Sequence, residues 1–258
     1  MAEETLFEQD GPVAILTFNR PEARNAMTWW MYETLRETCE RADADPATRV
    51  LVLRGAGDRA FVSGTDIRQF LEFRTREDAL GYEARLDRSI GRLAGMTKPS
   101  IAMVQGDAVG GGLFMALACD LRVAAEHTRW GVPVARTLGN FPAPANFARL
   151  AAAVGPVRAR NLTMTARLMG AAEAHAVGLV DEILPGDRLE ARVLELAHHV
   201  AGLAPLTLAA VKEATRRVSA AFALTDAEDL LLSCYLSQDF QEGVRAFVDK
   251  RPPRWQGR

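Results

Sequence analysis

Short apolar runs in the first half of the chain are typical of strands. They lie at residues 13–18, 50–54, 100–104 and 121–124. The runs at 50–54 and 100–104 are continuous rather than alternating, which is the pattern of strands buried on both faces of a sheet. Helical patterns separate them at 26–42, 79–93 and 113–118, and Asn25 is the expected N-cap of the first. This alternation predicts an α/β fold with a largely parallel sheet.

From about residue 142 onward, helical patterns replace the strand-like runs. They cover residues 145–152, 156–163, 171–177, 189–201, 206–220 and 226–248. Pro156 and Gly178 act as helix punctuation, one at a first turn and one just past an end. We expect an α/β core over residues 1–200 and a helical region over 201–258 that packs on the sheet or on a neighbouring subunit.

Composition removes several classes of function from consideration. A net charge of −2 over 258 residues gives no basic stripe for nucleic acid. The three cysteines have no C-x-x-C spacing and the four histidines no ligand pattern, so no metal site is expected. The acidic N-terminus precedes no apolar signal region, and no apolar stretch reaches the about 18 residues of a membrane span. These features predict a soluble cytoplasmic protein.

Two glycine turns carry the strongest chemical signal. Ser63-Gly64-Thr65-Asp66 and Gly110-Gly111-Gly112 each lie where a strand-like run gives way to a helical one. Their backbone N–H groups are able to hold one oxygen from two sides, as proteins do when they stabilise an oxyanion or an enolate. The second turn also begins a helix, whose dipole adds partial positive charge. The alternative is that Gly110–Gly112 only permits close packing of a helix on a strand.

Six motifs, in order and spacing over nearly the whole chain, resemble the crotonase superfamily of enoyl-CoA hydratases and isomerases. They begin at Asn19-Arg20-Pro21 and continue through residues 61–67, 106–112, 118–122, 172–180 and 247–251. The resemblance implies a spiral of β-β-α units with a C-terminal helical trimerisation region, assembled as a homotrimer or as a hexamer made of two trimers. It also implies acyl-CoA thioesters as ligands, with coenzyme A arriving as part of the substrate and no other cofactor.

The resemblance also assigns roles by position. The N–H groups of Thr65 and Gly111 would form the oxyanion hole. The CoA channel would be lined by Ser63, Asp66, Ile67 and Arg68, with Arg24 near the phosphates and Lys250 adding a charge. Simpler interpretations stay open: Asp66 is more readily an N-cap than a catalytic acid, and Lys250 equally fits a solvated basic turn.

The chain departs from the hydratase pattern at both catalytic positions. One family glutamate aligns with Phe114, and the other aligns with Val134 or Ala135, depending on where one extra residue is placed. We expect these three apolar residues to form a dry wall of the ligand pocket that suits apolar acyl chains. Hydration needs a base for water and an acid for the α-carbon. Because apolar residues replace both glutamates, ordinary hydratase chemistry with that pair is excluded here. The remaining candidates for acid–base or charge roles are Glu83, Asp87, Asp107 and Arg136, with a solvated helix face favoured for Glu83 and Asp87.

Three functional hypotheses follow. The leading one is an acyl-CoA enzyme that stabilises a thioester enolate with an acid or base outside the two usual positions. A variant uses Arg136 to hold an anionic acyl group, so that loss of CO₂ generates the enolate without a base. The competing hypothesis is a non-catalytic acyl-CoA binding protein. An α/β-hydrolase or a dehydrogenase is disfavoured, because neither G-x-S-x-G nor an early G-x-G-x-x-G occurs.

Overall fold

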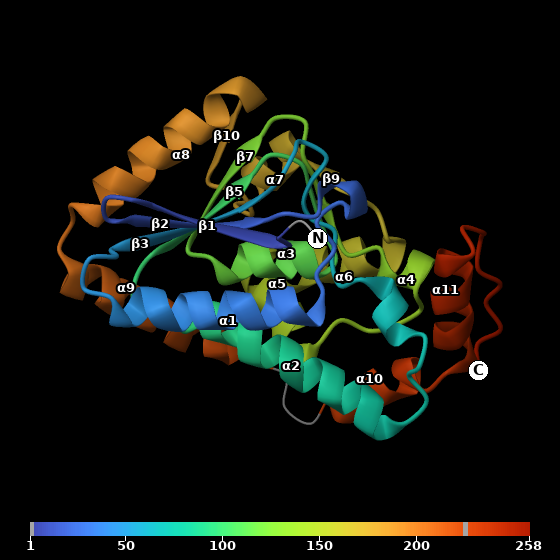
Figure 1. Cartoon of the computed structure of the whole chain (residues 1–258). Helices are drawn as coiled ribbons and strands as arrows, with labels where there is room; N and C mark the ends of the chain where they lie inside the picture. The colour runs from blue at the N-terminus through green and yellow to red at the C-terminus, as the bar shows by residue number, and fades with distance from the viewer. Residues whose placement is uncertain (1–2, 224–226) are drawn as a thin grey trace.

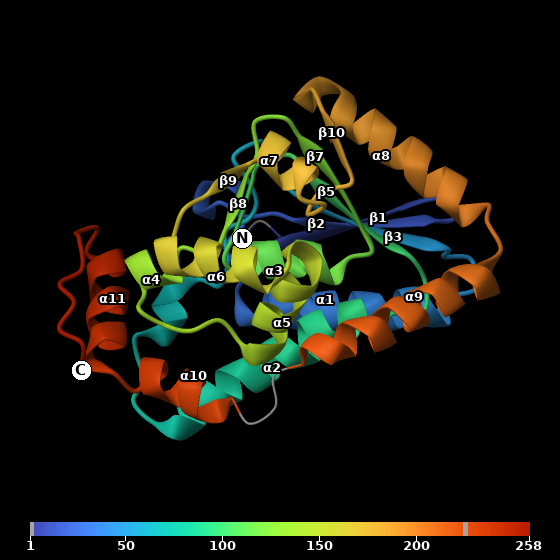
Figure 2. The same cartoon turned by 180° about the vertical axis from the view of Figure 1, so that it is seen from behind.

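The computed structural model describes residues 3–223 and 227–258, which form two β-sheets covered by helices (Figures 1 and 2). The strands are β1 (Thr5–Asp10), β2 (Val13–Phe18), β3 (Val50–Gly55), β4 (Ala60–Val62), β5 (Ser100–Val104), β6 (Asp107–Val109), β7 (Leu121–Ala125), β8 (Arg129–Gly131), β9 (Met169–Gly170) and β10 (Glu182–Leu184). The α-helices are α1 (Trp29–Ala44), α2 (Arg76–Ala94), α3 (Gly111–Ala118), α4 (Val134–Thr137), α5 (Pro144–Val154), α6 (Pro156–Thr165), α7 (Ala171–Ala176), α8 (Gly186–Ala201), α9 (Pro205–Ser219), α10 (Glu228–Tyr235) and α11 (Gln238–Val248). The 3₁₀ helices are η1 (Pro21–Ala23), η2 (Ile67–Phe70) and η3 (Ala220–Phe222).

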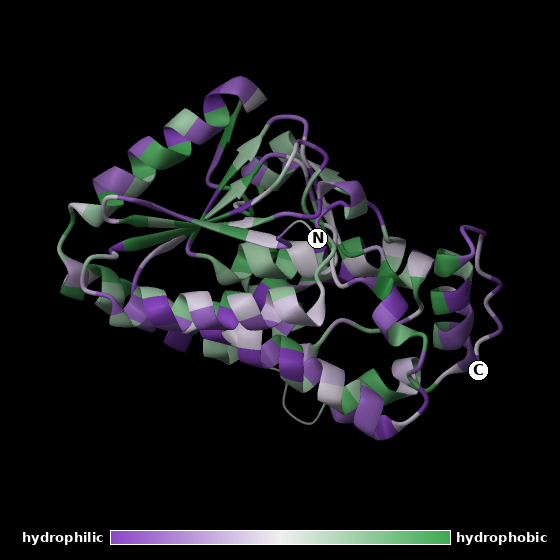
Figure 3. Cartoon of the chain, in the orientation of Figure 1, coloured by the Kyte–Doolittle hydropathy of each residue, from purple (hydrophilic) through white to green (hydrophobic). Residues whose placement is uncertain are grey.

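The inner strands β2, β3 and β5 of the larger sheet are buried on both faces. The order of this sheet is β1-β2-β3-β5-β7-β10, and every pairing from β2 onward is parallel. Along β3, Val50 and Val52 join the apolar cluster under α8, whereas Leu51 and Leu53 join the cluster under α1, α2 and α3. Figure 1 shows α8 on one side of this sheet and α1 on the other, and Figure 3 shows its inner strands as largely hydrophobic. The predicted α/β class and doubly buried strands are confirmed.

The chain builds this core as a spiral. From β3 onward, each turn contributes one strand to the larger sheet and the next to the smaller sheet, of order β4-β6-β8-β9, before a helix follows. The units β3-β4-α2 and β5-β6-α3 repeat this plan, and β7-β8 begin a third. As a result β4, β6 and β8 are parallel neighbours, so their carboxyl ends open at one edge.

Of the C-terminal helices, α10 and α11 return to this edge of the molecule, whereas α8 and α9 lie at its other end. In Figures 1 and 2, α8 continues into α9, which contacts α5 and has no buried residue. Further on, α10 packs against α2, and α11 packs against η2 and α4. No single helix of the described residues is long and apolar enough to cross a membrane; α8 and the α9–η3 segment pass that test only as a pair, bent by 106°.

Two predicted helices differ from the structure. The first begins at Trp29 and is capped by Thr28 rather than by Asn25. Asn25 adopts φ +54, and its side chain forms hydrogen bonds with the backbone of Arg20, Ala56 and Ala60 instead. The pattern at 226–248 contains two helices, α10 and α11, because the Ser237 hydroxyl caps a new start; its first residue lies outside the described part of the chain. The strands β4, β6 and β8 are three residues each, too short to predict by periodicity.

Candidate functional site

Sheet topology brings the two glycine turns together. Ser63–Asp66 follows β4, and Gly110 joins β6 to α3. Since β4 and β6 are parallel neighbours, both turns leave the same edge of the smaller sheet. A β-carbon built on Gly112 would lie 1.8 Å from the Val62 carbonyl oxygen, so α3 rests directly on the backbone of β4. Glycine at this position therefore sets the distance between the turns.

The turns touch through their backbones. Gly64 adopts φ +105 and Gly110 φ +57, conformations that favour glycine. A β-carbon on Gly64 would lie 3.3 Å from the Gly111 nitrogen, and one on Gly111 would lie 3.2 Å from the Gly64 α-carbon. Among the described residues, the Thr65 and Gly111 N–H groups donate no hydrogen bond to the protein, whereas Gly110 N–H donates to the carbonyl of Gly131 at 2.9 Å. The N–H groups of Thr65 and Gly111 are thus two hydrogen-bond donors without a protein partner on adjoining backbone segments.

Buried tyrosines hold the first turn in place. The Thr65 hydroxyl lies 2.9 Å from Tyr32 Oη of α1 and 2.9 Å from Tyr82 Oη of α2. On its backbone side, Met27 N–H donates to the Gly64 carbonyl, which fixes the direction of the peptide that follows. Burial raises the pKa values of both tyrosines, so their hydroxyls stay protonated. Sequence reasoning missed these two tyrosines, because nothing local links them to residue 65.

A cavity of about 1100 Å³ opens at the turns and gathers most of the predicted site residues. Thr65 and Gly111 line it, together with the following predicted ligand-contacting residues: Arg24, Ser63, Asp66, Ile67, Arg68, Phe114, Val134, Arg136 and Lys250. Ala135 does not belong to the lining and is exposed, so Val134 is the residue of that pair that faces the cavity. The spiral therefore assembles segments from residue 20 to residue 250 around one space.

The cavity is more basic than the chain. Seven basic side chains line it against four acidic ones, although the whole chain carries a net charge of −2. The basic residues are Arg20, Arg24, Arg59, Arg68, Arg129, Arg136 and Lys250. Arg136 is exposed and makes no ion pair within the described part of the chain. This balance favours an anionic ligand such as a phosphate-bearing one.

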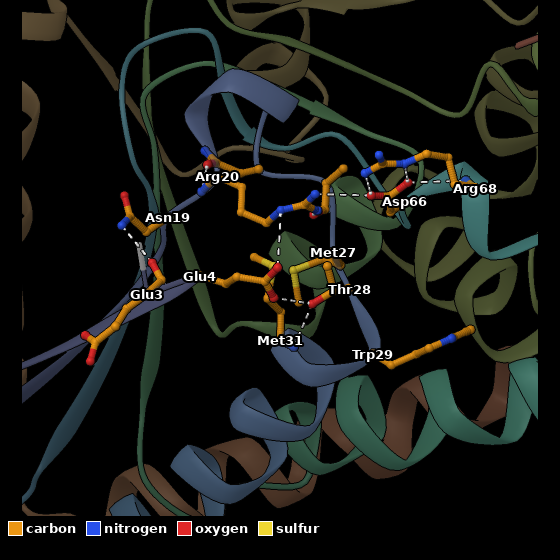
Figure 4. A network of polar contacts seen from close by, with 12 residues as sticks. Glu3, Glu4, Asn19, Arg20, Met27, Thr28, Trp29, Met31, Asp66 and Arg68 are labelled. Atoms are coloured by element: carbon orange, nitrogen blue, oxygen red, sulfur yellow. Dashed lines mark hydrogen bonds and ion pairs between the residues drawn. The ribbon is translucent and has the colours of Figure 1, made fainter. Parts of the chain in front are cut away.

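Asp66 is a structural carboxylate. It caps η2 by accepting from the Arg68 N–H, and it pairs with the Arg68 guanidinium at 2.6 Å and with Arg20 at 3.2 Å. Figure 4 shows Arg20 reaching from Glu4 on one side to Asp66 on the other. The hydrogen bonds from Arg68 lower the pKa of Asp66. The N-cap interpretation is confirmed. Asp107 is engaged in the same way, by a bidentate pair with Arg129 at 2.6 and 3.0 Å.

The prediction that Glu83 belongs to a solvated helix face is wrong, because its carboxylate is buried against Tyr235. Tyr235 Oη donates to Glu83 Oε1 at 2.8 Å, and Glu83 Oε2 is buried with no partner among the described residues. Leaving such an acceptor unpaired costs about 1–3 kcal/mol. Burial raises the pKa of Glu83 to about 7. Asp87, one turn further along α2, is exposed as predicted.

Apolar side chains form the inner wall beside these groups. Phe114 and Val134, two of the three residues that align with the hydratase glutamates, both line the cavity, with Phe70, Leu86 and Leu138 also in the lining. Phe114 is only 4% exposed. Within the described residues no cluster of histidine, cysteine or acidic side chains is arranged to hold a metal ion. The site thus offers backbone donors, an apolar chamber and one unpaired carboxylate oxygen.

Comparison with known proteins agrees with this geometry. A family model described as enoyl-CoA hydratase/isomerase matches residues 8–258. The chain is 33% identical to the 2,3-dehydroadipyl-CoA hydratase of Escherichia coli over 99% of both chains, and 31% identical to the crotonyl-CoA hydratase of Syntrophomonas wolfei over 96% of both. A crystal structure of methylmalonyl-CoA decarboxylase complexed with 2S-carboxypropyl-CoA superimposes with a TM-score of 0.90 at 28% identity, covering 100% of both chains.

Proposed function

Because this chain belongs to the enoyl-CoA hydratase/isomerase family, within the crotonase superfamily, we propose that it is an acyl-CoA enzyme that generates or protonates a thioester enolate in the cavity beside the two glycine turns. The N–H groups of Thr65 and Gly111 hold the thioester oxygen. The observation that carries this proposal is the contact between the two turns. It brings together, beside the cavity, two N–H groups that donate no hydrogen bond to the described residues.

Physical chemistry supports the assignment of roles. Negative charge develops on the thioester oxygen as the enolate forms, and donors fixed in advance stabilise it without reorganising. The seven basic residues around the cavity suit the phosphates of coenzyme A, and the apolar wall with Phe114 and Val134 suits a hydrocarbon chain. With apolar residues at both glutamate positions, hydration by the usual pair is excluded, and a reaction with fewer proton transfers is favoured.

A second candidate function is decarboxylation of an anionic acyl-CoA. Two observations favour it: Arg136 lines the cavity without an ion pair among the described residues, and methylmalonyl-CoA decarboxylase matches this fold with a TM-score of 0.90. The guanidinium would orient the carboxylate that leaves as CO₂, and the electron pair of the broken C–C bond would become the enolate. Cytoplasmic location and a homotrimeric or hexameric assembly remain predictions.

Calorimetry and isotope exchange test the proposal together. We expect acyl-CoA to bind more tightly than free coenzyme A, and deuterium from D₂O to enter the α-position of the bound thioester. Binding without exchange would identify a non-catalytic acyl-CoA binding protein, and absence of binding would refute the proposal altogether. For the second candidate, malonyl-CoA should release CO₂, and Arg136→Gln should slow that release while leaving exchange in a neutral thioester unchanged.

A further inference from the structure

Two residues that line the cavity carry buried polar atoms without a hydrogen-bond partner among the described residues. In the described part of the chain, three buried side-chain atoms lack a hydrogen-bond partner: Glu83 Oε2, Asn140 Oδ1 and Gln105 Oε1. The first two belong to residues that line the same cavity, and Gln105 does not. Buried polar groups are nearly always paired, so two exceptions in residues that line one cavity are consistent with partners that arrive with a ligand.

A short hydrogen-bond chain joins the two residues. Asn140 Nδ2 lies 3.1 Å from Tyr235 Oη, which in turn donates to Glu83 Oε1 at 2.8 Å. The three side chains come from the segment after α4, from α10 and from α2. Tyr235 also packs against Tyr82, at 6.0 Å between ring centroids, and Tyr82 bonds to Thr65. This connects Glu83 to the turn that carries the proposed oxyanion donors.

The other acidic residues of the cavity are occupied or exposed. Asp66 pairs with two arginines, and Asp107 is held by Arg129. Glu22 is exposed on η1. Glu83 is therefore the lining carboxylate with a buried oxygen that accepts no hydrogen bond from the described residues.

We propose that Glu83 transfers the proton to and from the α-carbon of the bound thioester, and that Tyr235 and Asn140 position its carboxylate. This inference rests on the proposed function and adds the acid–base group that the two apolar glutamate positions leave missing. Tyr235 occupies one oxygen of Glu83, so the other is left for the reacting C–H bond.

The step balances without a further reactant. Glu83 Oε2 takes the α-proton, the C–H electron pair forms the enolate C=C bond, and the carbonyl π pair moves to the oxygen held by Thr65 and Gly111. Return of the proton to the α-carbon is exchange. Return at the γ-carbon of a 3-enoyl thioester gives the conjugated 2-enoyl thioester, so one carboxylate suffices for double-bond migration.

The charge environment of Glu83 suits this role. Burial raises its pKa to about 7, the hydrogen bond from Tyr235 lowers it, and the Asp87 charge on the same helix raises it. Burial, together with the negative charge of Glu83, raises the pKa values of Tyr32 of α1, Tyr82 of α2 and Tyr235 of α10, so the three neighbouring hydroxyls stay protonated and neutral. A group with a pKa near neutral pH both accepts and returns a proton efficiently.

The test uses 3-hexenoyl-CoA in D₂O with the full-length protein, following deuterium incorporation by mass spectrometry and conjugation by ultraviolet absorbance. We expect Glu83→Gln to slow both by about 10²–10⁴-fold while the Kd of the thioester changes by less than about threefold. Glu77→Gln is the matched control, because Glu77 is an exposed carboxylate of the same helix and lies outside the cavity lining.

Tyr235→Phe provides a second readout that a structural role would not move. Loss of its hydrogen bond should raise the pKa of Glu83, so the rise of exchange rate with pH should shift to higher pH with the Kd nearly unchanged. A Glu83→Gln variant that exchanges at the wild-type rate, or a pH profile unmoved by Tyr235→Phe, overturns the inference. A wild-type protein that binds the thioester without exchange also overturns it, whereas a protein that binds no thioester refutes the proposed function instead.

Discussion

Replacing Gly111 with proline isolates the contribution of a single backbone donor. Proline has no N–H, and Gly111 is the first residue of α3, a position where proline is accepted because the N–H there has no partner within the helix. The substitution therefore removes the donor while the helix keeps its hydrogen bonds.

The size of the effect follows from the geometry. Losing one oxyanion donor costs about 2.7–4 kcal/mol of transition-state stabilisation, or about 10²–10³-fold in rate. Proline also adds a β-carbon, which at this position would lie 3.2 Å from the Gly64 α-carbon and 3.4 Å from Tyr32 Oη. That contact is tight enough to move the turn slightly, so it requires its own control.

Gly111→Ala is that control, because it adds the same β-carbon and keeps the N–H. The assay compares the α-proton exchange rates of the two variants at saturating acyl-CoA, with thermal unfolding to verify folding. We expect Gly111→Pro to be about 10²–10³-fold slower than Gly111→Ala, while the Kd values of the bound thioester stay within a few-fold. Equal exchange rates in two folded, thioester-binding variants would refute the proposed oxyanion hole.

Three further predictions concern stability. The pKa of the Glu83 carboxyl is about 4.5 in the unfolded chain and about 7 in the folded protein, so its contribution to stability is full below about pH 4.5 and is lost as pH rises through 7. The free energy of unfolding of Glu83→Gln should therefore exceed that of the wild type by up to about 3 kcal/mol near pH 8 and by almost nothing near pH 4. Equal differences in urea unfolding at both pH values would contradict this. Asn25→Ala should lose about 2–4 kcal/mol, because it strands buried backbone groups and places alanine at φ +54, and Asn25→Gly should recover only the backbone part; wild-type melting of the glycine variant would contradict the hydrogen-bond argument. Gly112→Ala should lower the free energy of unfolding by about 3 kcal/mol or more, because the new β-carbon would overlap the Val62 carbonyl oxygen. Gly81→Ala should raise it by about 0.5–1 kcal/mol, because a β-carbon there would have no atom within 4 Å. Similar melting temperatures of the two variants would contradict the packing argument.

Sequence patterns predicted the strands that consist of continuous apolar runs of about five residues. The strands β2, β3, β5 and β7 were predicted to within about a residue, because each is a continuous buried run. The strands β4, β6 and β8 were not, because three residues carry no period and their pairing comes from the spiral. Asn25 was misread for a similar reason: its side chain bonds to residues 56 and 60, which lie far along the chain.

The site divides in the same way. Glycine turns are visible in sequence, because their backbone requires glycine, and the cavity lies beside them. Glu83 resembled any acid on an amphipathic helix, since its burial depends on Tyr235, which is 152 residues away. Its position in the cavity is a property of how α10 packs on α2, and no local pattern carries that information.

The most direct test of the central claim is a crystal structure of the protein with a stable acyl-CoA analogue. We predict that the thioester oxygen lies about 2.7–3.1 Å from both the Thr65 and the Gly111 nitrogen, with the α-carbon facing Glu83 Oε2. An oxygen bound elsewhere in the cavity, or amides that bond to the protein instead, would contradict it.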